Sequence, residues 1–362
     1  MCNRWFKYIQ IAMLGMLSMV QATAAGQAPH KIVTDHAPAI PDPEGFAGMF
    51  AGVSNQVLVA AGGANFPGKK PWEGGAKVWY ADVFLLKKGA AAWEKSPVSL
   101  PRPLGYGVSA SYKNNIILAG GSDREQHHRD VYRISVQGDK VIIDSLAPMP
   151  YALANMAGAL VGDVLFVAGG TLTPEGNPGK LFLALDLKHN KWITLDPWPG
   201  AERMNAVAAV ADQRFFLFSG IQVLDTKEGK LRKVLEDGYC FVPSYRNGVL
   251  VGGHWKVLAP MPRGVAAGPG PGPVFGKRYI VFPGGLDHQT AQHADPLTHP
   301  GFLPDILAYD LQQKKWMVFD RFPRADMRLT APTVVWDNRC FIINGELRPG
   351  IRSNAVLSFN LE

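Results

Sequence analysis

The nine residues 344–352 (NGELRPGIR) place an acid and a base close enough to do chemistry. Glu346 and Arg352 are six residues apart, and the Pro349-Gly350 pair between them favours a turn that folds Arg352 back. An acid and a base placed across a ligand can move protons in both directions. The segment therefore predicts a proton-transfer site, with a turn stabilised by a surface ion pair as the alternative.

A second group of polar residues precedes several of the predicted strands. A guanidinium fork binds a carboxylate through two hydrogen bonds, so several arginines round one opening would suit a small anionic ligand. If they do not bind a ligand, they are solvated charges on the rim. The candidates for substrate binding are Arg102, Arg203, Asn205, Arg263 and Arg328.

Recurring glycine doublets indicate the scaffold that positions these residues. Each doublet ends an apolar run rich in β-forming residues, and the spacing of about 50–65 residues is typical of kelch-type propeller blades. The doublets are Gly62-Gly63, Gly120-Gly121, Gly169-Gly170 and Gly284-Gly285, with variants at Ser219-Gly220 and Asn344-Gly345. They predict an all-β fold, a six-bladed kelch-type β-propeller, over residues 26–362.

Each unit reads as four strands. In the second unit they are expected at Gly105–Tyr112, Asn115–Ala119, Asp130–Val136 and Lys140–Leu146. First strands are rich in small residues, as a narrow channel requires, and late aromatic residues such as Trp192 and Trp316 should pack one blade on the next. The sixth unit has three strands, at Thr330–Trp336, Arg339–Ile343 and Ala355–Asn360. The strand His30–Asp35 should complete it, so that the N-terminal strand closes the C-terminal blade and leaves no open edge.

The first 25 residues have the features of a cleaved signal peptide. Arg4 and Lys7 precede an apolar run, and Ala22-Thr23-Ala24 is a small-x-small cleavage signal. We expect a periplasmic protein with no membrane attachment after cleavage. Cys240 and Cys340 fall in units four and six, which are not neighbours, and are therefore expected to be free core residues.

Net charge and motifs narrow the choice of ligand. The formal charge is +7, and removal of the two basic residues of the signal leaves +5. This excess favours small anions over nucleic acid. The Gly-Pro run 268–273 lacks the backbone donors that a phosphate loop needs, and the histidines at 288, 293 and 299 match no metal-binding spacing. We expect neither metal nor cofactor.

Two segments resemble the kelch-propeller sialic acid mutarotases, also called N-acetylneuraminate epimerases. That family has a motif N-G-E-x-K/R-P-G-x-R, here Asn344–Arg352, and a segment like P-x-G-x-A-G-x-F-A-G-x-S-N, here Pro43–Asn55. In the family the second segment lies downstream of the first, whereas here it is N-terminal, so the chain resembles a circularly permuted member. A ring tolerates such a change of its opening point.

The resemblance implies an isomerase that interconverts the α and β anomers of free sialic acid by acid/base ring opening and closure. Glu346 would be the general base and acid, Arg352 would hold the carboxylate or polarise the opening oxygen, and the protein would be a homodimer. Two alternatives remain open: a non-catalytic exported kelch module that binds glycan or protein, and an epimerase or lyase for a related acidic sugar.

Overall fold

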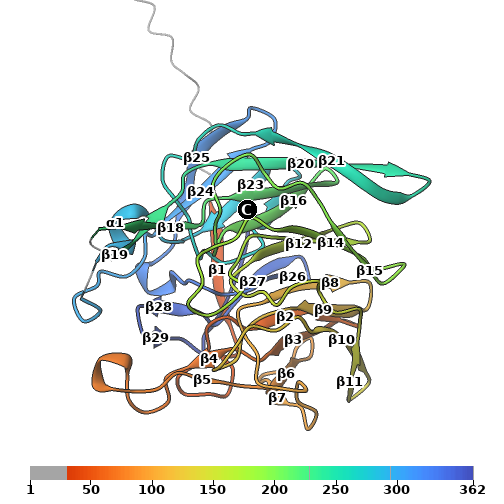
Figure 1. Cartoon of the computed structure of the whole chain (residues 1–362). Helices are drawn as coiled ribbons and strands as arrows, with labels where there is room; N and C mark the ends of the chain where they lie inside the picture. The colour runs from red at the N-terminus through yellow and green to blue at the C-terminus, as the bar shows by residue number, and fades with distance from the viewer. Residues whose placement is uncertain (1–30, 228, 294, 362) are drawn as a thin grey trace, which may run out of the picture.

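The computed structural model describes residues 31–227, 229–293 and 295–361, and the predicted signal peptide lies outside them. In these residues, six four-stranded antiparallel sheets stand round a common axis, which confirms the six-bladed propeller (Figure 1). The axis runs roughly from left to right in Figure 1, because the connections between second and third strands, which include β4, β18 and β28, lie on the left. No helix of the described part is long and apolar enough to cross a membrane.

The blades follow one another along the chain, and in blades 1 to 3 each successive strand lies further from the axis. Blade 1 is β2 (Phe50–Ser54), β3 (Val57–Ala61), β6 (Val83–Leu86) and β7 (Glu94–Lys95). Blade 2 is β8 (Val108–Tyr112), β9 (Asn115–Ala119), β10 (Val131–Gln137) and β11 (Lys140–Ser145). Blade 3 is β12 (Ala157–Val161), β13 (Val164–Ala168), β14 (Phe182–Asp186) and β15 (Lys191–Thr194).

The second half of the ring has longer outer strands. Blade 4 is β16 (Val207–Ala211), β17 (Arg214–Phe218), β20 (Gly238–Arg246) and β21 (Val249–Val257). Blade 5 is β22 (Val274–Phe275), β23 (Tyr279–Pro283), β24 (Asp305–Asp310) and β25 (Lys315–Arg321). Blade 6 is β26 (Thr333–Trp336), β27 (Arg339–Ile343), β30 (Val356–Leu361) and, outermost, β1 (Ile32–Ala37).

Three short hairpins decorate the loops between second and third strands. They are β4 (Ala64–Asn65) with β5 (Val78–Trp79), β18 (Ile221–Thr226) with β19 (Gly229–Val234), and β28 (Glu346–Arg348) with β29 (Ile351–Arg352). The same loops hold the one described α-helix, α1 (His288–Ala291), and a 3-10 turn, η1 (Pro71–Glu73). A second such turn, η2 (Arg324–Asp326), lies between blades 5 and 6. The helical residues therefore lie in connections, while the blades are purely strands.

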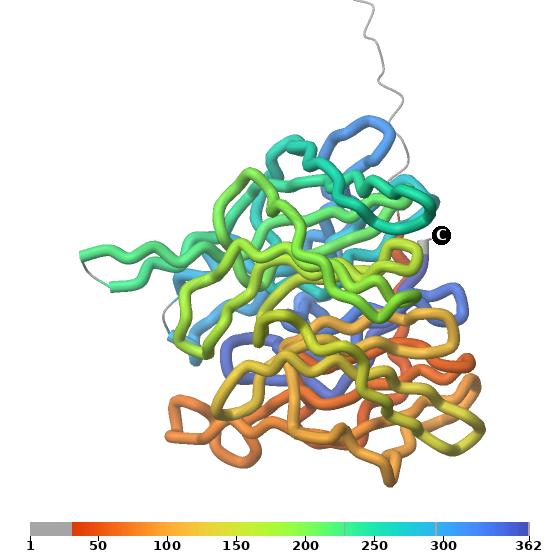
Figure 2. Tube along the Cα trace, turned by 45° about the vertical axis from the view of Figure 1, so that its right-hand side comes forward, coloured from red at the N-terminus to blue at the C-terminus, as the bar shows by residue number. Residues whose placement is uncertain are grey.

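The strand from the N-terminus closes the ring, as predicted. β1 pairs with β30 in an antiparallel ladder from Ile32↔Leu361 to Ala37↔Val356. Its red trace lies beside the blue C-terminal strands in Figure 1 and in the turned view of Figure 2. The predicted bounds, His30–Asp35, were two residues early, because the ladder extends to His36 and Ala37 where β30 begins.

Two first strands, β8 and β26, are shorter than the sequence indicated. β8 begins at Val108 because Gly105 pairs with Ser122, outside the blade's ladder. β26 begins at Thr333, since Thr330 bonds to Ala267 of the preceding blade and breaks the strand's line. Both departures have one cause. The residues just before each first strand bond to other segments round the ring, and strand propensity does not predict such contacts.

That ring is a closed cycle of backbone hydrogen bonds, one residue per blade, which we call the belt. Each belt residue has a left-handed backbone, with φ between +49° and +67°, and donates its N–H to the carbonyl of the belt residue in the preceding blade, at 2.7–2.8 Å. The belt residues are Gly48, Tyr106, Asn155, Asn205, Ala267 and Thr330. A left-handed conformation is unusual outside glycine, so the belt is a strained feature that the surrounding blades must hold.

Aromatic side chains fill the space between blades. Between blades 3 and 4, Phe182 packs on Phe215 and Phe241, with ring centroids 5.6 and 4.9 Å apart. Tryptophans of outer strands also tie blades together: Trp192 Nε1 donates to Ala147 O, and Trp316 Nε1 donates to Ala259 O. The predicted packing of late aromatic residues between blades is therefore confirmed. Cys240 and Cys340 are buried and free, as expected.

Removing β1 should destabilise the whole ring, since β30 would become an exposed edge. A chain that begins at Pro38 should melt roughly 5–10 °C below one that begins at Lys31, because a six-residue ladder of hydrogen bonds at about 1 kcal/mol each is lost. Thermal unfolding followed by circular dichroism measures the difference. Equal melting temperatures would show that closure contributes nothing to stability.

Candidate functional site

The hairpin β28–β29 brings the predicted acid and base together. Glu346 pairs with Arg352 in the hairpin's register, and Arg352 Nη1 donates to Glu346 Oε1 at 3.1 Å. The same oxygen accepts the N–H of Gly350 at 2.9 Å, so the turn itself fixes the carboxylate. The side chain of Glu346 retains 19% exposure and that of Arg352 retains 5%. One oxygen of Glu346 is thus held by protein groups, and the other can meet a ligand.

Neighbouring blade 1 supports this hairpin from the side. Arg352 lies over the ring of Phe66, 4.8 Å from its centroid, and Asn354 donates its side-chain N–H to the carbonyl of Asp42. Asp42 in turn accepts hydrogen bonds from the N–H groups of Glu44 and Gly45. The N–H of Gly345 donates to the carbonyl of Phe46 at 2.8 Å, so the segments Pro43–Asn55 and Asn344–Arg352, at opposite ends of the sequence, meet across the closure of the ring.

The propeller places Glu346 one step outside the belt. In each blade the residue before the belt residue forms a β-bridge with the residue after the glycine doublet, and in blade 6 this bridge is Leu329↔Glu346. The belt residue Thr330 comes next and lines the central cavity. Glu346 therefore lies at the mouth of the channel, on the side of the loops between second and third strands.

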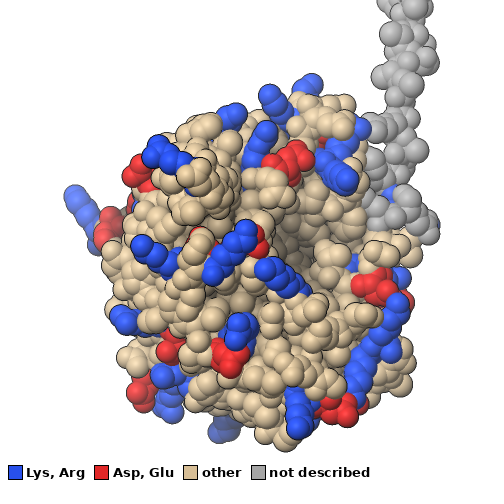
Figure 3. Space-filling model, turned by 90° about the vertical axis from the view of Figure 1, so that its right-hand side faces the viewer, with Lys and Arg blue, Asp and Glu red and all other residues tan. Residues whose placement is uncertain are grey.

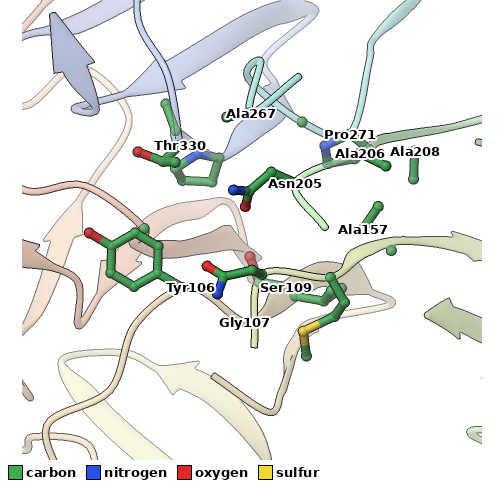
Figure 4. Close-up of a pocket in the computed structure, with 18 of the residues that line it drawn as sticks. Tyr106, Gly107, Ser109, Ala157, Asn205, Ala206, Ala208, Ala267, Pro271 and Thr330 are labelled. Carbon is green, nitrogen blue, oxygen red and sulfur yellow. The ribbon is translucent and has the colours of Figure 1, made fainter. Parts of the chain in front are cut away.

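The cavity lies at the centre of the ring, directly inside the belt. Its volume is about 110 Å³. Small residues form its wall: Ser109, Ala157 and Ala208 of the first strands, and Gly107 just before β8 (Figure 4). This agrees with the prediction that small residues face the channel. The polar belt side chains Tyr106, Asn205 and Thr330 gather near its entrance (Figure 4).

Polar atoms without a protein partner concentrate at this mouth. In native proteins nearly all buried polar atoms are hydrogen-bonded, so those that are not require an explanation. Among the described residues, four buried atoms of this kind lie between blades 1, 2 and 6: Trp79 Nε1, Tyr106 OH, Thr330 Oγ1 and Arg352 Nε. The arrangement offers several donors to an oxygen-rich ligand.

Sequence reasoning missed one charged residue at the mouth, Lys77. Its ammonium lies over the rings of Tyr106 and Trp79, with Nζ 4.0 and 4.6 Å from the centroids. Such cation–π contacts are worth about 0.5–1 kcal/mol each where water can reach them. The signal that could have found Lys77 is its place one residue before the Val78–Trp79 strand, in the loop that follows a glycine doublet.

The predicted rim arginine Arg203 is buried in the blade rather than at the cavity. It is 0% exposed, and its guanidinium grips Asp237 through two bonds of 2.6 and 2.9 Å. It also donates to the carbonyl of Ser219 and lies over the rings of Trp198 and Tyr239. Burial works against ionisation of Asp237, but the hydrogen bonds and charge of Arg203 hold the pKa of that carboxyl below its usual value. In this structure Arg203 joins elements of blade 4 to one another.

The other rim candidates are held in different ways. Arg102 is exposed and pairs with Asp130 and His128. Arg263 donates to the carbonyls of Gly264 and Asp305, and burial lowers its pKa. Arg328 is 2% exposed and makes one long bond, 3.4 Å, to the carbonyl of Ala325; burial lowers its pKa also. Of the five binding candidates, Asn205 alone lines the cavity.

The opposite face of the propeller differs from this mouth. There the turns between first and second strands surround a hollow near the centre, and charges of both signs are interspersed (Figure 3). No group of three or more residues able to hold a metal ion occurs in the described part of the chain.

Comparisons with known proteins agree with these features. A sequence model of the N-acetylneuraminate epimerase family matches residues 18–143. N-acetylneuraminate epimerases of Haemophilus influenzae (strain PittEE) and Pasteurella multocida (strain Pm70) are 26% and 27% identical over 227 and 231 residues. Each match covers 57% of this chain and 56% of the relative. The N-acetylneuraminate epimerase of Salmonella enteritidis PT4 is 42% identical over 89 residues, 22% of each chain.

This chain is similar to the N-acetylneuraminate epimerases over part of its length. The resemblance read from the two motifs is confirmed, although the chain spans about half the length of the curated relatives it matches. Among solved structures, "Structure of YjhT" superposes with a TM-score of 0.64 and 16% identity, covering 90% of this chain and 99% of the other. At that identity the likeness concerns the fold.

Replacing Arg203 should destabilise the protein. Arg203→Met leaves a partly buried carboxylate unpaired, which should cost about 3 kcal/mol and lower the melting temperature by roughly 5 °C at pH 7. Because the pKa of Asp237 is lowered in the folded state, the pair stabilises above about pH 4, the usual pKa of a free aspartate, and loses this effect as pH falls through the folded value. The gap between variant and wild type should therefore narrow in acid.

Arg214→Met provides the matched control for that experiment, since Arg214 lies exposed on the neighbouring strand β17. It should melt within about 1 °C of wild type at every pH. If Arg203→Met were as stable as this control, the assigned role of Arg203 would be wrong.

Proposed function

We propose that this protein is a mutarotase for free N-acetylneuraminate, an isomerase that interconverts its α and β anomers. The observation that carries the proposal is the Glu346–Arg352 pair, 3.1 Å apart at the mouth of the central cavity, within a segment that resembles a motif of the N-acetylneuraminate epimerases. The family match and the polar mouth support it.

The reaction needs proton transfer and orientation. The substrate is a cyclic hemiketal whose anomeric carbon also bears the carboxylate. Glu346 takes the proton of the anomeric hydroxyl, the bond from the anomeric carbon to the ring oxygen breaks, and protonated Glu346 gives this proton to that oxygen as the open ketone forms. Reclosure on the other face of the carbonyl reverses these steps, so one carboxylate serves as base and then as acid.

Arg352 has a different part in this scheme. Its guanidinium stabilises negative charge through its N–H donors rather than exchanging a proton. Its Nη1 orients Glu346, and its buried Nε has no partner among the described residues. We assign it to positioning Glu346 and to polarising the oxygen on which charge develops during ring opening.

The proposal also covers the order of the two family segments along the chain and the export of the protein. We propose that the chain is a circularly permuted relative, because the two segments lie at opposite ends of the sequence and yet are in contact, through the N–H of Gly345 and the carbonyl of Phe46. We also propose export to the periplasm, on the evidence of residues 1–25. Dimer formation stays a prediction.

Glu346→Gln should slow anomerisation by about 10²–10⁴-fold, because the amide keeps the shape of the side chain and loses its basicity. The measurement is proton NMR of freshly dissolved single-anomer N-acetylneuraminate, with equilibration followed at fixed enzyme concentration. Glu94→Gln, on the exposed outer strand β7, is the matched control and should react at the wild-type rate. Equal rates for Glu346→Gln and wild type would reject the assignment.

A further inference from the structure

Lys77 is a cation at this mouth that remains available to a ligand. Of the arginines proposed from sequence, Arg102 and Arg203 have carboxylate partners, whereas Arg263 and Arg328 are directed to backbone carbonyls. No described carboxylate lies within ion-pairing distance of Lys77. Lys70, in the same loop, does have an acidic partner, Glu44.

The loop geometry holds Lys77 in place. β4 and β5 pair Ala64 with Trp79 and Asn65 with Val78, so the next two positions, Phe66 and Lys77, follow in the same register. Phe66 carries the guanidinium of Arg352 over its ring. The hairpin thus sets Lys77 on the same border of the mouth as the Glu346–Arg352 pair.

Two aromatic rings orient the ammonium group. Nζ lies 4.0 Å from the centroid of Tyr106, a belt residue that lines the cavity, and 4.6 Å from that of Trp79. Tyr106 in turn is fixed from beneath, because a Cβ on the belt residue Gly48 would come within 2.6 Å of the tyrosine ring. The π faces attract the charge but take up no conventional hydrogen bond, so the three N–H donors of Lys77 remain available.

We propose that Lys77 binds the carboxylate of the substrate at the lip of the cavity and so selects acidic sugars. This inference rests on the proposed function and names the group that recognises the substrate's charge. A preoriented ammonium gains charge-assisted hydrogen bonds on binding a carboxylate. The hydroxyls of Tyr106 and Thr330, buried and without a partner among the described residues, are placed to meet sugar oxygens beside it.

The test compares N-acetylneuraminate with its methyl ester, which lacks the negative charge. Wild-type protein should bind the acid more tightly than the ester in isothermal titration calorimetry. Lys77→Met should weaken binding of the acid by about tenfold or more and remove the preference for acid over ester. Lys77→Arg should keep part of the preference. In the anomerisation assay, KM for the acid should rise in Lys77→Met with a much smaller change in kcat, because the contact forms in ground state and transition state alike.

Lys69→Met is the control, since Lys69 is an exposed lysine of the same loop. It should bind both compounds as wild type does. The proposal is overturned if Lys77→Met retains the wild-type preference or if wild type shows none, even when anomerisation proceeds normally. If the preference depends on Lys77 but wild type does not accelerate anomerisation, the binding role stands and the proposed function fails.

Discussion

The belt of backbone hydrogen bonds is the constraint on which the rest of this structure depends. Each blade can bond to its neighbour through the belt only if one residue at its entry takes a left-handed backbone, and Thr330, a β-branched residue, does so at φ +49°. Such conformations cost of order 1–3 kcal/mol each outside glycine. Packing between blades, such as that of Phe182 on Phe215, must outweigh this cost. The belt closes where Gly48 of blade 1 donates to Thr330 of blade 6, and β1 separately covers the outer edge of β30 in blade 6.

The same belt creates six equivalent positions for functional side chains, and the sequence distinguishes them. The residues one step outside it are Ala64, Ser122, Thr171, Ile221, Leu286 and Glu346. Five are neutral and one is an acid, so a nearly symmetric scaffold carries an asymmetric site. Blades 1, 2 and 6 contribute charge and unpartnered polar atoms to the mouth, whereas Ile221 and Leu286 of blades 4 and 5 pack in an apolar cluster. A sugar, with polar and apolar faces, suits such a division.

Two arginines show why a position in the repeat does not define a role. Arg203 and Arg328 each lie two residues before a belt residue, where other blades have Leu104, Leu153, Val265 or Phe46. Both side chains therefore point into the packed blade. Arg203 meets Asp237 there, whereas Arg328 finds a single backbone carbonyl among the described residues. Sequence spacing placed both at the rim, because it reports the order of residues along a loop and not the direction of their side chains.

The sequence by itself determined the repeat, the six blades, the closing strand and the hairpin of Glu346 and Arg352. These follow from local patterns: apolar runs of strand length, glycines where the backbone turns left-handed, and a Pro-Gly turn over six residues. Only the tertiary structure decided which charges lie near the mouth of the cavity and which are paired inside a blade. The ammonium of Lys77 lies over the rings of Trp79 and of Tyr106, which precedes the next blade. Arg203 instead pairs with Asp237, 34 residues away, inside blade 4. Partners so distant in sequence are chosen by how the blades pack, which no local pattern records.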